Sequence, residues 1–211
     1  MLITVIDLGI NNLTSVSKSF RVSMKSSDEL NVITNEGKFD KPDLIVLPGL
    51  GKFSAGMQEL TNRNLIPVIQ KWVDGGSKLV GICLGMQLLG DFSDESPGIK
   101  GLGLISGTSL KLEMKLNEKV PNVGWREVSG VKSEEMLQSL DRNLDFYFVH
   151  SYHFKPLNQD DALAISKFGN SSFVSAIKND NICGFQFHPE KSGDNGVLLV
   201  NEILNWGRDE N

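Results

Sequence analysis

Residues 80–87 read VGICLGMQ, and this stretch decides the fold. An apolar strand runs into a turn of small residues and a helix-forming run follows. The pattern therefore predicts a strand, a sharp turn and a helix, with Cys83 at the tip. Gly81 and Gly85 flank the cysteine two residues away on each side. They leave space for a strained backbone and for close packing of the strand against the helix. This is the geometry of a nucleophile elbow.

The elbow predicts a chemical role for Cys83. The N-terminus of the following helix places partial positive charge at the sulfur, which favours the thiolate. It also aims backbone N–H groups at the position where an oxyanion would form. The competing interpretation is a buried cysteine that only packs, and the cysteine alone does not decide between the two. Cys183 lies in a strand without an elbow, so we expect it to be a small core residue.

The first half of the chain alternates between strand and helix. Continuous aliphatic runs such as Leu44–Leu47 suit strands buried on both faces of a parallel sheet. Strand–helix alternation with short Gly-rich links favours an α/β fold with right-handed crossovers. The expected strands cover residues 2–6, 31–34, 44–47 and 78–82, and the expected helices cover residues 65–74, 86–92 and a first helix capped by Asn11 or Asn12 that runs to about 25.

The second half carries short strands and one helix. Asn179-Asp180 separates two apolar runs and predicts a hairpin turn, because both residue types tolerate positive φ. The expected strands cover residues 110–113, 124–128, 146–149, 162–166, 173–178 and 182–187, before a helix over 196–206. We therefore expect a single domain over residues 1–211, with a central, mostly parallel sheet flanked by helices and antiparallel strands in the C-terminal half.

Composition excludes several classes of protein. The chain has 211 residues, 40% of them hydrophobic and 22% charged, which is ordinary for a globular domain. The net charge of −5 argues against nucleic acid or an anionic membrane as the main partner. Two cysteines 100 residues apart make neither a disulfide framework nor a zinc-finger set, so no metal or cofactor is expected. The N-terminal run lacks a basic start and meets Asp7 early, so we expect a soluble, cytoplasmic protein.

A candidate base and its orienting partner lie near the C-terminal end of the chain. His188 and Glu190 are two residues apart, and in extended geometry they project to the same side. Pro189 between them stiffens the backbone. A thiol nucleophile needs a base, and the base needs a group that fixes its tautomer. A lone histidine is more often structural, but together with Cys83 this pair predicts a Cys–His–Glu relay.

Gly49, Leu50 and Gly51 follow the strand at 44–47. Loops after parallel strands lie at the carboxyl edge of the sheet, so this loop and Cys83 should face one crevice. The glycines would let a backbone N–H reach an oxyanion. An ordinary strand-to-helix turn is the competing interpretation, and a phosphate loop is excluded by the absence of its Gly-Lys-Ser/Thr ending.

These three segments together resemble the class I, triad-type glutamine amidotransferases. Residues 81–87 (GICLGMQ) and 184–192 (GFQFHPEKS) match the two signatures of that family, and the resemblance spans nearly the whole chain. Residues 121–125 (PNVGW) and 146–152 (FYFVHSY) are similar to the branch that serves imidazole glycerol phosphate synthase in histidine biosynthesis.

The resemblance implies a reaction and a set of site residues. Cys83 would attack the side-chain carboxamide of L-glutamine, His188 would carry the thiol proton to the departing ammonia, and Glu190 would orient His188. Water would then release glutamate from the thioester. The oxyanion hole would involve Gly49, Leu50, Gly51 and Leu84, and glutamine would be held by Gln87, Glu95, Ser151 and Tyr152.

The resemblance also implies a partner. Ammonia becomes mostly ammonium in bulk water at neutral pH, so it must travel through a protected path. The implied partner is a separate (β/α)₈-barrel cyclase subunit that makes imidazole glycerol phosphate and the aminoimidazole carboxamide nucleotide AICAR in a heterodimer. The interface candidates are Asn12, Trp125, Tyr147, His150 and Lys191.

Departures from the family pattern keep alternatives open. Leu8 replaces an aromatic residue, Asn11 a glycine and Asn122 a histidine, and residues 90–94 also differ from the usual pattern. A paralogous subunit that serves a nucleotide-sugar or surface-polysaccharide synthase would share the same triad. A non-catalytic scaffold on the same fold and a Cys–His peptidase are the rivals from other classes.

Overall fold

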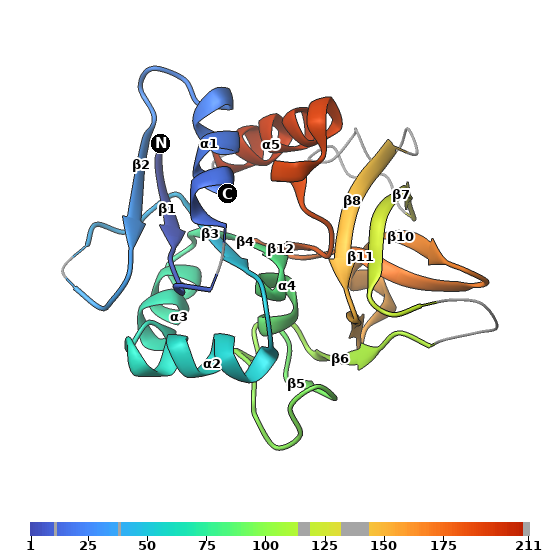
Figure 1. The fold of residues 1–211 in the computed structure, drawn as a ribbon. Helices are drawn as coiled ribbons and strands as arrows, with labels where there is room; N and C mark the ends of the chain where they lie inside the picture. The colour runs from blue at the N-terminus through green and yellow to red at the C-terminus, as the bar shows by residue number, and fades with distance from the viewer. Residues whose placement is uncertain (11, 38, 114–118, 132–143, 209–211) are drawn as a thin grey trace.

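The computed structural model describes residues 1–10, 12–37, 39–113, 119–131 and 144–208. Within them, nine strands form one mixed sheet in the order β2-β1-β3-β4-β12-β11-β10-β7-β8 (Figure 1). The pairings from β2 to β12 are parallel, and those from β12 to β8 are antiparallel. The strands are β1 (Leu2–Ile6), β2 (Glu29–Ile33), β3 (Leu44–Gly49), β4 (Lys78–Cys83), β7 (Asn122–Gly130), β8 (Leu144–His150), β10 (Ala162–Phe168), β11 (Ser171–Asn179) and β12 (Ile182–Phe185).

Helices cover both faces of the parallel part of the sheet. On one face α1 (Leu13–Ser23) and α5 (Gly193–Arg208) bury their apolar sides against β1, β3 and β4. On the other face α2 (Phe53–Asn62) and α3 (Ile66–Asp74) do the same. Figure 1 shows the two pairs on opposite sides of the sheet. The predicted α/β fold, with parallel strands first and antiparallel strands in the C-terminal half, is therefore confirmed.

The local sequence pattern did not predict helix α2 or strands β5 (Phe92–Ser93) and β9 (Tyr152–Pro156). Helix α2 was not predicted because Lys52, at its N-cap, makes no side-chain capping bond. Its first N–H groups instead donate to Glu95 and Ser96, 42 residues away. Strand β9 was also missed, because it contains a lysine and ends in a proline. It pairs antiparallel with β6 (Gly107–Lys111) in a small second sheet that also holds β5.

Other predicted bounds shift by a few residues. The helix expected over 86–92 is α4, Leu84–Leu88, and Phe92 lies in a strand. The strand expected over 182–187 ends at Phe185. Asp180 has φ +46°, in agreement with the predicted hairpin turn between β11 and β12. Asn11, one of the two predicted helix caps, lies outside the described residues, while Asn12 accepts a hydrogen bond from the backbone of Ser15.

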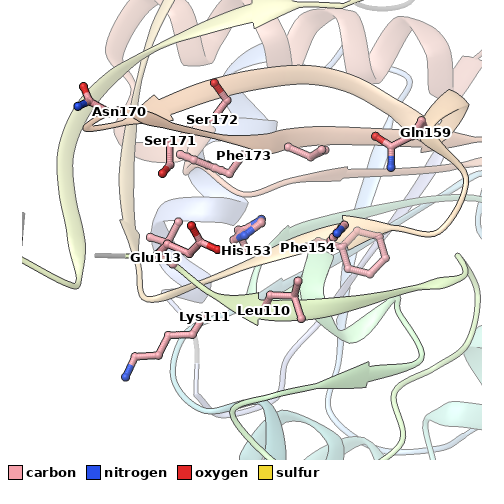
Figure 2. A pocket seen from close by; sticks show the side chains of 13 residues that line it. Leu110, Lys111, Glu113, His153, Phe154, Gln159, Asn170, Ser171, Ser172 and Phe173 are labelled. Atoms are coloured by element: carbon pink, nitrogen blue, oxygen red, sulfur yellow. The ribbon is translucent and has the colours of Figure 1, made fainter. Parts of the chain in front are cut away.

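A cavity of about 530 Å³ separates the small sheet from β11. Figure 2 shows His153 and Glu113 side by side in it, with Ser171 and Phe173 across the opening. It holds none of the predicted site residues. Across the described ranges, no helix combines the length and apolar character that a membrane crossing requires.

Candidate active site

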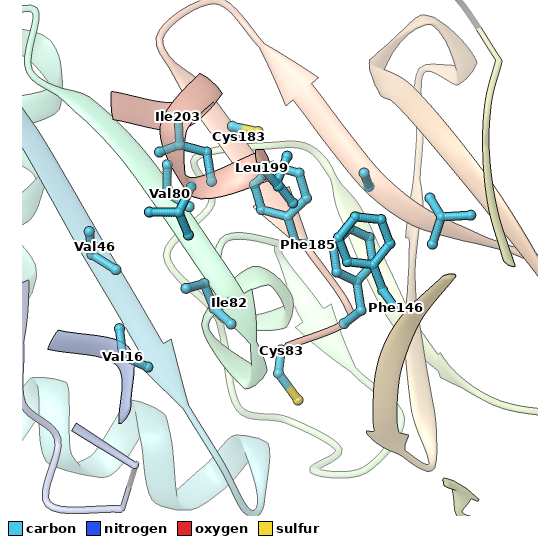
Figure 3. Close-up of a cluster of buried hydrophobic side chains, with 14 of the residues drawn as sticks. Val16, Val46, Val80, Ile82, Cys83, Phe146, Cys183, Phe185, Leu199 and Ile203 are labelled. Carbon is cyan, nitrogen blue, oxygen red and sulfur yellow. The ribbon is translucent and has the colours of Figure 1, made fainter. Parts of the chain in front are cut away.

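Cys83 sits at a strained turn between β4 and α4. Its backbone angles, φ +55° and ψ −110°, are rarely adopted by residues other than glycine. The two flanking glycines are required by contact distance. A Cβ on Gly85 would stand 1.7 Å from the carbonyl oxygen of Leu47, and one on Gly81 would stand 2.7 Å from the backbone nitrogen of Met86. Figure 3 shows the Cys83 sulfur at the end of β4, at the edge of the buried cluster and beyond Ile82. The predicted elbow is present.

Sheet register brings His188 to the same edge as Cys83. Strand β12 runs parallel to β4 and pairs Phe185 with Ile82, so the chain beyond each strand emerges at the carboxyl end of the sheet. The backbone N–H of His188 then donates to the carbonyl of Tyr147 at 2.9 Å. Two strands that are far apart in sequence thus place the nucleophile and the base together.

Nδ1 of His188 lies 2.7 Å from Oε1 of Glu190, and both side chains are 2% exposed. We expected an extended segment, but residues 189–191 form one 3₁₀ turn. Burial by itself lowers the pKa of His188, yet the charges of Cys83 and Glu190 and the hydrogen bond with Glu190 outweigh it and raise that pKa to about 10. The surroundings of His188 therefore favour its protonated ring.

A cavity of about 310 Å³ opens at Cys83. It is lined by all four residues predicted to hold glutamine and by most of the predicted oxyanion loop. The lining set is Leu50, Gly51, Lys52, Cys83, Leu84, Gln87, Glu95, Pro121, Val149, His150, Ser151 and Tyr152. His188 and Glu190 line a separate small space together with Gly49 and Asn12. The structure thus brings the nucleophile, the oxyanion loop and the glutamine-binding candidates together.

Two of the glutamine-binding candidates also form hydrogen bonds with other residues of the chain. Glu95 accepts a hydrogen bond from the backbone of Phe53 at 2.7 Å, which caps α2. The amide nitrogen of Gln87 donates to the carbonyl of Tyr152 at 2.8 Å and to Oε1 of Gln186 at 3.0 Å. Both amide hydrogens of Gln87 are therefore in use, and its side-chain oxygen is the group that remains for a substrate.

The loop at residues 49–51, predicted to form the oxyanion hole, is held in place by the N-terminal loop. Gly49 pairs with Cys83 in the sheet register, and a Cβ on Gly49 would lie 3.0 Å from the Cβ of Leu84. The N–H of Leu50 donates to the carbonyl of Ile10 at 3.0 Å. In this conformation the N–H of Leu50 is not available to an oxyanion. Gly51, with φ +108°, is the position where the backbone can rotate without steric cost.

The interface candidates separate into two groups. Trp125 is 50% exposed and meets Tyr147 edge to face, with ring centroids 6.1 Å apart. Nζ of Lys191 lies 5.9 Å from the centroid of the Tyr147 ring. These three form one accessible group near the site, and Asn12 is half-buried at the start of α1. His150 differs, because its ring is buried.

The ring of His150 is bonded on both nitrogens. Its Nε2 accepts from the amide of Asn122 at 2.9 Å, and its Nδ1 donates to the carbonyl of Tyr152 at 2.9 Å. Burial lowers the pKa of His150 to about 3, so the ring is neutral. The ring therefore lies in the wall of the cavity at Cys83, and a role of His150 at the partner interface stays a prediction.

Sequence reasoning missed Gln186, which donates to the Cys83 sulfur at 3.8 Å. It lies inside the quoted signature two residues before His188, and that position was the available signal. Cys183 is fully buried, as expected for a core residue. In the described part of the chain, no three Asp, Glu, His or Cys side chains gather in a way that could hold a metal ion.

A family model described as glutamine amidotransferase class-I matches residues 4–204. The chain belongs to the class-I glutamine amidotransferase family. Membership makes it a glutamine amidotransferase, an enzyme that takes the side-chain amide nitrogen of glutamine.

Relatives agree with this assignment across the whole chain. The imidazole glycerol phosphate synthase subunit HisH of Pyrococcus furiosus is 39% identical over 198 residues, which are 94% of this chain and 95% of that protein. The subunit of the same name in Prochlorococcus marinus is 37% identical over 208 residues, 99% of this chain and 96% of that protein. The solved structure of PurLQS from Thermotoga maritima superposes with a TM-score of 0.73 at 16% identity, covering 97% of this chain and 98% of that one, which supports the fold.

Proposed function

We propose that this chain is the glutaminase subunit of imidazole glycerol phosphate synthase in histidine biosynthesis. The observation that carries the proposal is the buried His188–Glu190 pair at the sheet edge that also presents Cys83 to a cavity. The named relatives, at 37–39% identity over nearly the full chain, support the histidine-pathway branch. The amidotransferases of solved structure are 14–18% identical, so they support the fold alone.

The geometry supports a thioester mechanism. His188, with its pKa raised to about 10, accepts the proton of the Cys83 thiol. The sulfur attacks the side-chain carbonyl carbon of glutamine, and the imidazolium passes its proton to the leaving nitrogen, which departs as ammonia. Water, deprotonated by His188, then cleaves the thioester to glutamate. Glu190 keeps the imidazolium oriented and stabilised throughout.

The remaining site residues bind different groups of the glutamine substrate. The carboxylate of Glu95 suits the α-ammonium of glutamine, and the oxygen of Gln87 is free to accept from a substrate N–H. Ser151 and Tyr152 supply backbone at the β8–β9 junction on the same cavity. The N–H of Leu84 and an N–H from Gly49–Gly51 form the oxyanion hole once the loop rotates away from Ile10.

The partner is a (β/α)₈-barrel synthase subunit that receives ammonia. Trp125 is exposed and contacts Tyr147, Lys191 lies over the Tyr147 ring, and Asn12 caps α1 beside His188 and Glu190. Docking over this group would cover the cavity mouth and keep ammonia away from bulk water, where it would be protonated. The complex would release imidazole glycerol phosphate and AICAR.

Two experiments test the proposal. Diazo-oxonorleucine, a glutamine-like electrophile, should label Cys83 in the complex and not Cys183; an unlabelled Cys83 would favour the scaffold reading. Glutamine-dependent product formation should appear on mixing with a histidine-pathway barrel subunit. If no product forms with that subunit but forms with a nucleotide-sugar synthase, the proposed partner is wrong and the proposed glutaminase activity still stands.

The departures that raised the alternative partner differ in exposure, because Phe92 and Asp94, within residues 90–94, are exposed. The departures that raised it include Leu8 and Asn122, and both side chains are fully buried. Neither can contact a partner directly. Asn11 lies outside the described residues.

A further inference from the structure

A line of hydrogen bonds runs through the wall of the active-site cavity and ends on the nucleophile. At its last step, Nε2 of Gln186 donates to Sγ of Cys83 at 3.8 Å. The oxygen of the same amide accepts from Gln87 at 3.0 Å. Gln186 is fully buried between these two groups. A buried amide with both ends occupied has one orientation, because reversing it would set donor against donor.

The orientation of Gln186 is fixed by the next residue in the line. Gln87 has two amide hydrogens, one directed at the carbonyl of Tyr152 and the other at Gln186. Because Gln87 can only donate through that nitrogen, Gln186 must present its oxygen to Gln87. Its NH₂ group is then left facing the sulfur. A donor aimed at sulfur favours the thiolate over the thiol.

The far end of the line is fixed as well. The carbonyl of Tyr152 also accepts from Nδ1 of His150, and Nε2 of His150 accepts from Asn122 on β7. The neutral ring of His150 therefore has one tautomer. The line thus connects β7, β8, α4 and the residue that follows β12, and every donor and acceptor in it has a single direction.

We propose that Gln186 is a positioning residue that holds the Cys83 sulfur and stabilises its negative charge through an N–H···S hydrogen bond. The inference rests on the proposed role of Cys83 as nucleophile and adds a residue that the triad does not include. The competing explanation is that Gln186 only fills the core between β12 and α4. The two explanations differ in what they predict for an isosteric change that keeps the shape and removes the donor.

The test is the pH dependence of Cys83 alkylation by iodoacetamide in the full chain, located by mass spectrometry of the Cys83 peptide. Gln186→Glu keeps the side-chain shape and the acceptor for Gln87 but places a carboxylate oxygen at the sulfur. We expect its alkylation rate at pH 7.5 to fall about tenfold and its profile to move to higher pH, the size expected for a hydrogen bond to a charged group. Gln186→Leu removes both hydrogen bonds, and its rate of Cys83 alkylation should also fall. This second variant keeps the inference testable if Gln186→Glu does not fold.

Kinetics of the complex give the second readout. Both variants should lower kcat for glutamine hydrolysis about tenfold or more and change KM less than threefold. Gln159→Glu adds the same charge on an exposed turn and should match wild type in both assays. Folded variants with wild-type alkylation profiles would overturn the inference and leave the proposed function standing. Full glutaminase activity in Cys83→Ala would instead overturn the proposed function.

Discussion

Nδ1 of His188 and Oε1 of Glu190 are 2.7 Å apart in a site that excludes water from both side chains. A carboxylate in this position does two things. It fixes the ring so that Nε2 faces away from it, and Nε2 forms no hydrogen bond with any described residue. It also favours the protonated ring. Both effects depend on the negative charge of Glu190. A substitution that keeps the shape of this side chain and removes its charge therefore tests them.

Glu190→Gln should therefore cost activity and change the pH dependence of stability. We expect kcat/KM to fall about 10²–10⁴-fold, as for loss of the orienting acid in other triads. The pKa of His188 is raised from 6.5 to about 10, so its contribution to stability is complete below pH 6.5 and is lost as pH rises through about 10. In urea unfolding, the gap between wild type and variant should be largest below pH 6.5 and should narrow toward pH 10.

The control for this prediction is Glu127→Gln, which removes the same charge from an exposed strand position. It should leave kcat/KM and the unfolding profile close to wild type. A gap between wild type and Glu190→Gln that stays constant from pH 6 to pH 10 would show that Glu190 does not act through His188.

The strained backbone of Cys83 predicts an unusual order of stability. At φ +55° and ψ −110°, a Cβ is costly, and glycine removes that cost. Cys83→Gly should therefore be more stable than Cys83→Ala by about 1 kcal/mol, the low end of the range for such strain. At Cys183, in a regular strand, the order should be reversed by a similar amount. Thermal unfolding of the glycine and alanine variants at Cys83 and Cys183 measures both differences. The same order of stability at both positions would show that the backbone of Cys83 is not strained.

The sequence predicted the parts of the site that local pattern determines. The flanking glycines located the elbow, and the signature at 184–192 located the base. The N-terminus of α2 was not predictable in this way, because Glu95 satisfies it across 42 residues. For the same reason the sequence did not predict that the ring of His150 is buried in the cavity wall. Alternation along residues 146–152 does not reveal that Asn122 and Tyr152 enclose its ring.

Burial of neutral His150 predicts a window of acid destabilisation. Its pKa is about 3 in the folded chain and near 6.5 when unfolded, so the unfolded state binds the proton first. The contribution of His150 is complete above pH 6.5 and is lost as pH falls toward 3. His150→Phe has no proton to bind. The stability advantage of wild type over this variant, measured by urea unfolding, should shrink between pH 6.5 and 4. An advantage independent of pH would mean that the ring accepts a proton in the folded state.

Trp125 predicts a loss of affinity without a loss of stability. Its side chain is half exposed and meets the Tyr147 ring edge to face, so Trp125→Ala should change the unfolding free energy by less than about 1 kcal/mol. A large aromatic anchor at an interface is worth about 2 kcal/mol or more, so Kd for the barrel partner should rise at least tenfold by calorimetry. Leu157→Ala, at an 80% exposed position, is the control and should not alter Kd. Unchanged affinity in Trp125→Ala would move the interface elsewhere.

The hydrogen bond from Leu50 to Ile10 predicts that the isolated chain is a slow glutaminase. The bond occupies an N–H of the loop that we propose for the oxyanion hole, and Gly51, with φ +108°, lies next to it. Amide hydrogen exchange at Leu50 should be slow in the free chain. It should become faster when the partner and glutamine release the loop, with a rise in hydrolysis rate of at least tenfold. The N–H of Ile69, inside α3, bonds to Leu65 and should exchange equally slowly in both states. Equal hydrolysis rates with and without the partner, together with unchanged exchange at Leu50, would show that the loop is already in its working conformation.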